Sequence, residues 1–293
     1  MNVELPPEIF LVPNGIFGCS SYGSAYLLEG SDGLVLVDPG TSDSFPRILD
    51  WFEAHGIDIS RLTGVLLTHI HLDHAGAAGH LAEKISNIKI YVHRKGAPYL
   101  VDPSDLLESV RKATGERFPD YGTLKPIPEE LIVPVEKETI ISPNSRDILA
   151  LPTPGHAPHH LAYYDRATGA LFPGDSAGLY LEERLIPSTP PPSFDFEKSL
   201  SSLEEMEKLN PKLLLYPHFG PGANPEELLS DYEITLREWV EEIEKLLDRY
   251  EREESVVERV LEEKEDWRVS GVTREEIEMN VEGVLRYLSW KRG

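Results

Sequence analysis

Residues 64–74 read Gly64-Val65-Leu66-Leu67-Thr68-His69-Ile70-His71-Leu72-Asp73-His74, which places three imidazoles and a carboxylate within six positions directly after an apolar run. The apolar run predicts a buried strand. Side chains of this kind at a strand end predict metal binding, because solvated surfaces rarely need so many coordinating groups together. The stretch therefore predicts a fold in which a buried strand delivers a metal-binding loop to the edge of a sheet.

Three later residues stand in the same relation to apolar runs. His156 comes shortly after Leu149-Ala150-Leu151, Asp175 after Ala170-Leu171-Phe172, and His218 after Leu213-Leu214-Leu215. We expect the four strand ends to converge on one edge. Imidazole and carboxylate suit zinc, iron or manganese, and two closely spaced ions need about seven protein ligands with one carboxylate shared. The predicted ligands are His69, His71, Asp73, His74, His156, Asp175 and His218.

The cysteine content limits the chemistry of the site. Cys19 is the only cysteine, so an intrachain disulfide is excluded and no thiolate cluster can hold the metal. Any metal must be bound by nitrogen and oxygen. We expect Cys19 to be a small buried residue rather than a nucleophile.

Composition and charge exclude several classes of partner. The 293 residues are 40% hydrophobic and carry a formal charge of -23 without a long run of Lys and Arg, which argues against nucleic acid. No apolar run of about 18 residues and no signal-like start are visible, so we expect a soluble, cytoplasmic protein without membrane contact that acts on a small molecule. Glutamine is absent, and 3 Met, 24 Pro and 27% charged residues are typical of a heat-adapted protein.

The order of the apolar patterns indicates an α/β fold. Runs at 25–28 and 34–37 flank a turn at 30–33 and predict a hairpin, and a helical pattern at 44–56 precedes the strand at 65–67. Short apolar runs return between 131 and 215. Two layers of sheet with helices outside bury such runs most simply, so we expect a four-layer αββα sandwich over residues 1–222.

An insertion over about 97–130 interrupts this pattern. It contains a short helix expected over 105–114, capped by Ser104. The insertion is either a lid beside the site or a surface excursion without contact to substrate.

Residues 223–293 predict a C-terminal helical subdomain. Asn224 would cap a first helix that has Pro225 at its first position, a second helix begins near Ser255, and Thr273 with Glu276 forms a capping box for a third. These helices could cover the site, form a homodimer surface or complete the core.

Together the motifs resemble those of the metallo-β-lactamase superfamily, over residues from about 10 to 222. The family's H-x-H-x-D-H signature is matched by His69, His71, Asp73 and His74, and its three later ligands are matched in order by His156, Asp175 and His218. Asp38, in Val37-Asp38-Pro39-Gly40, matches the family's early strand-end aspartate, which supports the site from outside the ligand set. The resemblance implies the αββα sandwich of that family with a C-terminal helical extension.

The resemblance also implies a mechanism with two divalent ions, most readily zinc, with iron or manganese as alternatives. One ion would be held by His69, His71 and His156, the other by Asp73, His74 and His218, with Asp175 bridging them. In the family, a hydroxide between the ions is the nucleophile, and the ions polarise the substrate carbonyl and stabilise the leaving group. Asp73 would orient the hydroxide and relay a proton.

Departures from subgroup patterns narrow the expected substrate. Class B β-lactamases lack the bridging aspartate, and flavodiiron oxygen reductases place glutamate where His71 stands, so both activities are disfavoured. Homoserine lactonases usually have tyrosine at the position of Gly178, and residues 178–183 do not resemble the glutathione-binding segment of glyoxalase II. The layout looks most like glyoxalase II-like and quinolone-signal-response thioesterase-like proteins, which implies hydrolysis of a thioester or carboxylic ester.

Three alternatives remain open at this point. One is a lactonase, and another is an iron-dependent persulfide dioxygenase with a mononuclear site. The third is a regulatory or binding protein that retains the metal site and uses its helical tail for partner contact.

Overall fold

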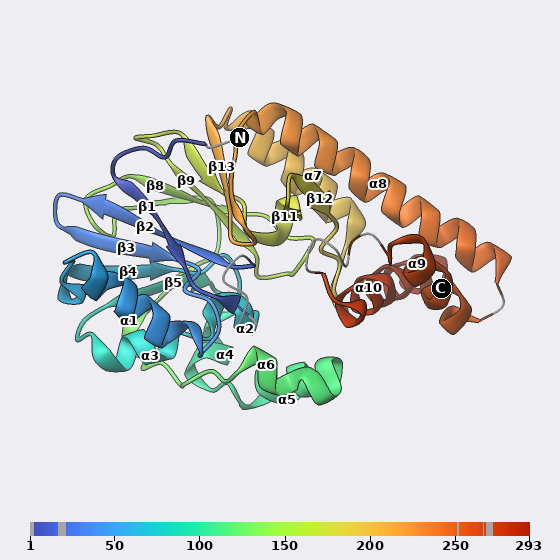
Figure 1. Cartoon of the computed structure of the whole chain (residues 1–293), viewed down its shortest axis with the longest axis horizontal. Coiled ribbons are helices and arrows are strands. Elements are labelled where there is room, and N and C mark those ends of the chain that lie inside the picture. Colours follow the sequence, from blue (N-terminus) through green and yellow to red (C-terminus); the bar gives the residue numbers. More distant parts are fainter. Residues whose placement is uncertain (1–2, 17–21, 251, 266, 268–271) are drawn as a thin grey trace.

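Two six-stranded sheets pack face to face, with helices on both outer faces (Figure 1). The computed structural model describes residues 3–16, 22–250, 252–265, 267 and 272–293. Within them the predicted four-layer αββα sandwich is confirmed. The prediction that Cys19 is a small buried residue concerns a position outside the described residues.

The first sheet has the strand order β1-β2-β3-β4-β5-β6. Its strands are β1 (Ile9–Pro13), β2 (Ser24–Gly30), β3 (Gly33–Val37), β4 (Leu62–Leu66), β5 (Lys89–His93) and β6 (Ile132–Val135). The strand β4, which precedes the histidine cluster, lies parallel to β3 and to β5 in the middle of the sheet. Helices cover its outer face and the second sheet covers its inner face, which explains its continuous apolar sequence.

The second sheet has the order β14-β13-β10-β9-β8-β7, and a separate hairpin joins β11 to β12. These strands are β7 (Thr139–Ile141), β8 (Ile148–Pro152), β9 (Leu161–Asp165), β10 (Ala170–Phe172), β11 (Leu179–Leu181), β12 (Arg184–Ile186), β13 (Leu213–Tyr216) and β14 (Gly220–Gly222).

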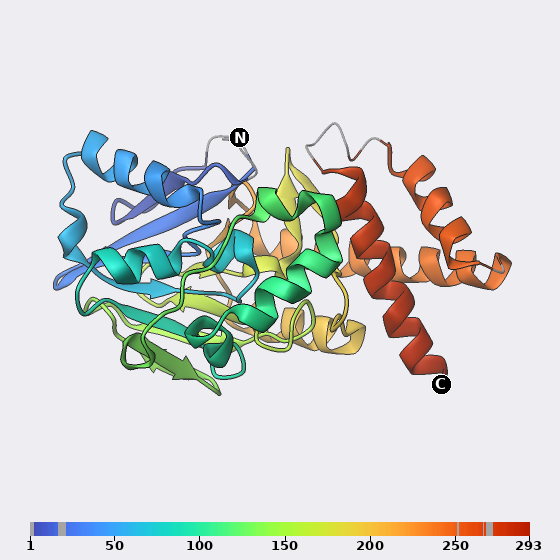
Figure 2. The same cartoon turned by 90° about the horizontal axis from the view of Figure 1, so that it is seen from below.

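The helices are α1 (Ser44–Ala54), α2 (Leu72–Ala75), α3 (Ala78–Lys84), α4 (Ala97–Val101), α5 (Ser104–Thr114), α6 (Phe118–Tyr121), α7 (Phe196–Lys208), α8 (Pro225–Arg249), α9 (Glu253–Glu263) and α10 (Arg274–Arg292). Figure 2 shows α5, from the insertion, lying beside the N-terminal part of α10. The hydrogen bond from Arg117 Nη1 to Thr273 Oγ1, 2.5 Å long, joins the insertion to the start of α10.

The alternation of side chains along each strand produces three apolar layers. Val35 and Val37 of β3 face the core between the sheets, whereas Leu34 and Leu36 face α1 and α3 on the outside. The third layer lies between the second sheet and the C-terminal helices, where residues of α8 and α10 share one cluster with strands β10 and β13. The division of the chain at residue 222 stays a prediction.

Asn224 is the N-cap of α8 as predicted but lacks a side-chain capping bond, whereas the predicted cap at Ser104 is displaced by one residue. Asn224 adopts a left-handed conformation, with φ 59°, and its side chain makes no capping bond, although Pro225 does occupy the first turn of α8. Ser104 is the first residue of α5 rather than its cap, since Asp102 Oδ1 accepts from both its N–H and its hydroxyl. The capping box between Thr273 and Glu276 is confirmed.

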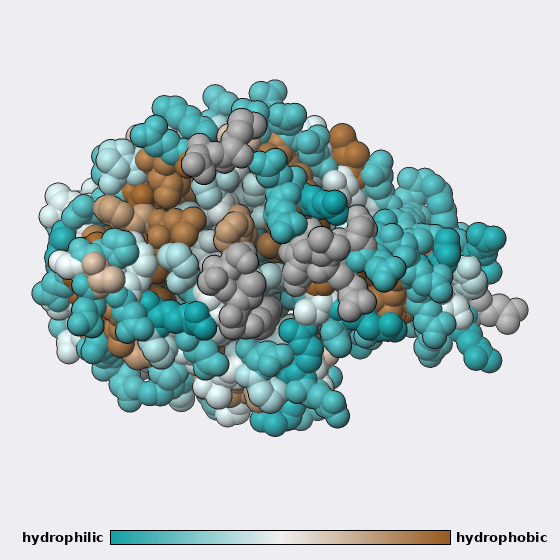
Figure 3. Space-filling view, viewed as in Figure 1, coloured by the Kyte–Doolittle hydropathy of each residue, from teal (hydrophilic) through white to brown (hydrophobic). Residues whose placement is uncertain are grey.

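The molecular surface agrees with the strongly acidic sequence. On the face drawn in Figure 3, hydrophilic residues cover most of the part formed by α8 and α9. Among the described helices, none has the length and apolar character needed to cross a membrane.

Candidate metal centre

The seven residues predicted to bind metal lie together at one edge of the sandwich. His69 and His71 follow β4, and Asp73 and His74 lie in the short helix α2. His156 lies between β8 and β9, Asp175 in the turn after β10, and His218 directly after β13. One sheet therefore supplies four of the side chains and the other sheet supplies three.

One group of donors consists of His69, His71 and His156. His71 Nδ1 lies 2.9 Å from His69 Nε2 and 3.0 Å from His156 Nε2. His71 Nδ1 has either one proton or one lone pair in the ring plane. It can therefore form a good hydrogen bond with only one of the two facing nitrogens. Three nitrogens that face one another in this way, two of them on buried side chains, suit a cation at their centre.

A second group consists of Asp73, His74 and His218. His74 Nε2 and His218 Nε2 are 3.2 Å apart, and Asp73 Oδ2 lies 3.6 Å and 3.5 Å from them. Asp175 joins the two groups, because Oδ1 is 3.3 Å from His74 Nε2 and Oδ2 is 3.8 Å from His156 Nε2.

Hydrogen bonds to oxygen fix the orientation of three of the imidazoles. His69 Nδ1 lies 3.0 Å from Thr68 Oγ1, which itself donates to Asp38 Oδ2. His74 Nδ1 lies 3.1 Å from Asp38 Oδ2, and His156 Nδ1 lies 3.1 Å from the carbonyl oxygen of Ser188. These oxygens accept the Nδ1 protons, which leaves the Nε2 lone pairs directed at the centre.

Asp38 supports this arrangement from the end of β3. Its Oδ1 accepts from Thr68 N at 2.8 Å, so one carboxylate holds both the loop and the His74 ring. The residue has φ 46°, a left-handed conformation that Asp adopts more readily than most residues. The predicted supporting role of Asp38 fits these contacts.

The two carboxylate oxygens of Asp175 differ, because one accepts a hydrogen bond and the other does not. Ser188 Oγ donates to Oδ2 at 3.1 Å, and the Asp175 N–H donates to His160 Nε2 at 3.1 Å. Oδ1 is buried and has no hydrogen-bond partner among the described residues. A buried carboxylate oxygen without a hydrogen-bond partner is costly unless a cation lies beside it.

The charges of the site also favour a cation. Burial and the neighbouring imidazoles hold the pKa of His69 and His71 well below the usual histidine value, so these rings are neutral ligands at neutral pH. Burial lowers the pKa of His74 as well, but the carboxylates of Asp73, Asp175 and Asp38 outweigh it and raise the pKa well above its ordinary value. The donor set thus fits divalent metal binding, while the assignment of individual ligands stays a prediction.

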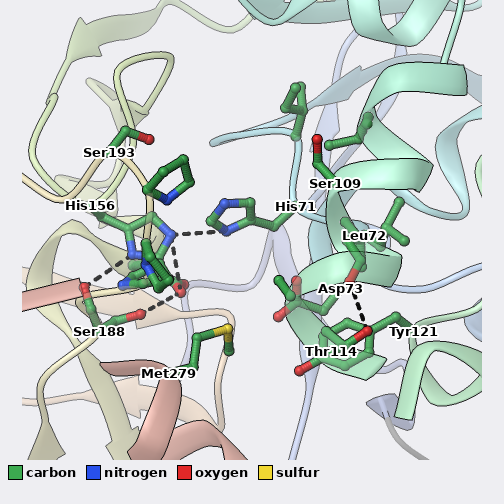
Figure 4. Close-up of a pocket in the computed structure, with 18 of the residues that line it drawn as sticks. His71, Leu72, Asp73, Ser109, Thr114, Tyr121, His156, Ser188, Ser193 and Met279 are labelled. Atoms are coloured by element: carbon green, nitrogen blue, oxygen red, sulfur yellow. Dashed lines mark hydrogen bonds and ion pairs between the residues drawn. The ribbon is translucent and has the colours of Figure 1, made fainter. Parts of the chain in front are cut away.

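A cavity of about 500 Å³ opens onto these donors. Its lining includes Asp73, His71 and His156, together with residues of α5 and α10. Figure 4 shows His71 and His156 turned toward each other, with Ser109 and Thr114 on one wall of the cavity and Met279 on another. The insertion is therefore a wall of the cavity rather than a remote surface excursion.

Sequence reasoning missed several supporting residues. Ser188 and Tyr22 line the cavity, but no motif marks either of them. The ring of Tyr22 lies edge-on to that of His218, with centroids 5.3 Å apart. His160 also supports the centre, because its Nε2 accepts from the Asp175 backbone N–H.

The remaining histidines lie outside the donor groups. His55 stacks on Trp51 and His80 on Phe45, whereas His93 Nδ1 accepts from Lys95 N. His159 lines the cavity near His71, with ring centroids 6.1 Å apart, and burial lowers its pKa to about 4.

A family model described as the metallo-beta-lactamase superfamily matches residues 21–218. The metallo-beta-lactamase fold-containing protein ST1585 of Sulfurisphaera tokodaii is 29% identical over 213 residues, which cover 71% of this chain and 77% of that protein. A hydroxyacylglutathione hydrolase of Bdellovibrio bacteriovorus is 26% identical over 188 residues, covering 64% of this chain and 59% of the relative.

Solved structures share the fold. The metallo-beta-lactamase family protein TTHA1429 of Thermus thermophilus superposes with a TM-score of 0.77 at 21% identity and covers 99% of this chain and 95% of its own. The crystal structure of ST1585 superposes with a TM-score of 0.70 at 24% identity, covering 96% of this chain and 99% of its own. These likenesses extend over the C-terminal helices as well as the sandwich.

Proposed function

The chain belongs to the metallo-beta-lactamase superfamily, and from this premise we propose that it is a dinuclear metal-dependent hydrolase of a thioester or carboxylic ester. The observation that supports the proposal best is the position of the Asp175 side chain. Its carboxylate lies between the two groups of donors, and its Oδ1 has no hydrogen-bond partner in the described part of the chain.

The proposed ligand sets follow the two donor groups. His69, His71 and His156 would hold one ion, Asp73, His74 and His218 the other, and Asp175 would contact both. Divalent ions bound there would supply Lewis acidity and a water of lowered pKa, close to neutral. The protein's own contribution is to hold the donors in place before any ion or substrate arrives.

Asp73 is the proposed proton acceptor. Its side chain is 16% exposed and lines the cavity, whereas Asp175 is more deeply buried and held by Ser188. An accessible carboxylate at the floor of the cavity would orient the attacking water and take up its proton at Oδ1 or Oδ2. The same group would then return that proton to the leaving alcohol or thiol.

The substrate class rests on two supports. The relative named hydroxyacylglutathione hydrolase bears a name that describes hydrolysis of an acylated thiol. The present chain also combines His71 with Asp175, whose carboxylate lies between the two donor groups. This combination favours hydrolysis over redox chemistry at the site.

The test is metal quantification on purified protein followed by a substrate panel. The panel contains thioesters, carboxylic esters, lactones and a persulfide, each assayed with zinc, manganese and iron supplied. We expect hydrolysis of thioesters or esters. One iron per chain with sulfite formed from the persulfide, or no hydrolysis with any metal, would overturn the proposal.

A further inference from the structure

The cavity above the donors is bounded by two parts of the chain that are far apart in sequence. One wall is α5 of the insertion and another is the first half of α10, while the donor loops form the floor. Arg117 from the insertion bonds to Thr273 at the start of α10, which fixes the two walls relative to each other. A substrate that extends from the donors into the cavity would therefore contact these helices.

The helix α5 presents apolar side chains to the cavity. Leu106, Val110 and Ala113 recur at helical spacing and line it, and Leu72 from the donor loop lies nearby. Although the structure describes all of α5, none of its residues is buried. Leu106 and Val110 are half-buried against the core outside the first sheet, and Ala113 is exposed. Part of this apolar helix face therefore stays accessible beside the reactive centre, which is typical of a surface that binds an apolar ligand.

On α10, the polar groups that face the cavity already have partners within the protein. Glu276 accepts from the Tyr22 hydroxyl at 2.8 Å, and its other oxygen accepts from Thr273 N at 2.7 Å. Asn280 Oδ1 accepts from Thr189 N at 2.6 Å. Met279, which lies between them and lines the cavity, presents a flexible apolar surface.

Two hydroxyl groups of the lining are also engaged. Thr114 Oγ1 donates to the carbonyl of Val110 at 2.8 Å, and Ser188 Oγ donates to Asp175 at 3.1 Å. Apart from Ser109 on α5, these polar groups are engaged within the protein, so the surface that α5 and α10 offer to a ligand is chiefly apolar. A polar substrate arm placed there would lose water without regaining its hydrogen bonds.

We propose that the space between α5 and α10 binds a hydrocarbon arm of the substrate, so that the hydrolysed ester or thioester carries an aliphatic chain. This inference rests on the proposed function and specifies its substrate class. Leu106, Val110, Ala113 and Met279 determine how long a chain is accepted.

The first test measures binding and does not depend on hydrolysis. Butanol, hexanol and octanol are titrated into the purified, metal-containing protein by calorimetry. Their hydroxyl groups are identical, so the change in Kd along the series reports the contribution of the hydrocarbon chain alone. We expect the Kd to fall about three- to fourfold per added methylene. A Kd that does not change with chain length would overturn the inference.

A pair of variants tests where the hydrocarbon chain of the ligand binds. Ala113→Trp fills the cavity from an exposed helix position, so the fold should tolerate it. We expect this variant to bind octanol no more tightly than butanol. It should also lower kcat/KM for octanoyl esters about tenfold or more relative to acetyl esters. Lys112→Trp is the matched control, since Lys112 lies on the same helix with 74% of its side chain exposed. Equal effects of the two variants would contradict the placement.

Failure of this inference is distinguishable from failure of the proposed function. If octanol binds tightly but no ester or thioester is hydrolysed, the hydrocarbon site stands and the proposed chemistry is wrong. If acetyl and octanoyl esters are hydrolysed with equal kcat/KM and alcohol binding is independent of chain length, the chemistry stands and the hydrocarbon site is wrong.

Discussion

Asp38 illustrates how a single residue organises the centre without binding the ion itself. Its two carboxylate oxygens accept hydrogen bonds from Thr68 and His74, and Thr68 in turn contacts His69. The geometry of two proposed ligands therefore depends on one carboxylate at the end of β3. Partners of this kind commonly affect metal affinity almost as much as the ligands do.

Replacing Asp38 with Asn tests this dependence. Asn tolerates the left-handed conformation of the residue, but its amide nitrogen cannot accept a hydrogen bond. Either Thr68 N at Oδ1, or the Thr68 hydroxyl and His74 at Oδ2, therefore loses its acceptor. We expect zinc affinity to fall about 10- to 100-fold, measured by competition with a chromophoric chelator. Wild-type affinity in this variant would show that the His74 ring is held by other contacts.

Asp73→Asn tests the proposed proton acceptor. The amide cannot take up a proton, so we expect kcat/KM for the best ester or thioester to fall about 10²- to 10⁴-fold. Asp50→Asn, on the exposed face of α1, is the matched control and should leave kcat/KM unchanged. Activity near the wild-type level in Asp73→Asn would rule out the assigned role.

The raised pKa of His74 predicts proton release on metal binding. Because its pKa lies well above the ordinary value, His74 is protonated near neutral pH in the metal-free protein, whereas His69 and His71 are already neutral. A metal ion must displace that proton, and a bound water of lowered pKa can lose another, so we expect proton release on metal binding at pH 7. Titration calorimetry in buffers of different ionisation enthalpy measures the number, and the absence of release would contradict the assignment.

At the scale of elements, a buried ion pair ties the two sheets together. Arg146 Nη2 lies 2.6 Å from Asp165 Oδ2 at the end of β9, and Arg146 Nη1 donates to the Glu29 carbonyl in β2 at 2.8 Å. The Arg146 side chain is 9% exposed and that of Asp165 is fully buried. Arg146, in the turn between β7 and β8 of the second sheet, thus reaches β2 of the first sheet and stabilises the relative position of the two sheets.

We expect Asp165→Asn to destabilise the protein strongly, because it leaves the Arg146 charge buried without its partner. The free energy of unfolding should fall by about 3–5 kcal/mol, measured by equilibrium denaturation in guanidinium chloride. Glu136→Gln removes the partner of Arg94 in a pair whose side chains are both 66% exposed, and should change stability by less than about 1 kcal/mol. Similar effects of both changes would contradict this explanation.

The elements also show which features the sequence predicts and which it does not. Strand β4 and the donors after it are predictable because apolar runs and ligand-type residues are both local patterns. The contact of Ser188 with Asp175 and that of Tyr22 with Glu276 join residues 13 and 254 positions apart, and no local pattern marks them. The predicted cap at Ser104 was one residue off, because Asp102 supplies the hydrogen-bond acceptor at the start of α5. Asn224 does occupy the predicted cap position of α8, but its side chain makes no capping bond, and no local pattern marks that difference.

For the whole molecule, the centre joins the two sheets. The donors from His69 to His74 follow the first sheet, whereas His156, Asp175 and His218 belong to the second. Bound ions would therefore cross-link the layers of the sandwich and favour the folded state. The sequence predicted this convergence, but the position of α5 and α10 around the cavity depends on long-range packing.

Removing the metal should lower the thermal stability of the whole molecule. The metal-free centre keeps buried, unpaired donor atoms, and the stabilisation by a ligand at about 1,000 times its Kd amounts to about 4 kcal/mol. We expect a chelator to lower Tm by several degrees in calorimetry, and added zinc to restore it. An unchanged Tm would show that the fold does not depend on the ions.

The metal content of the purified protein tests the central claim most directly. Elemental analysis after loading with zinc and removal of the excess should give two ions per chain, because both donor groups and the Asp175 carboxylate between them are formed in the folded chain. A value of one ion or none would contradict the dinuclear centre on which the account rests.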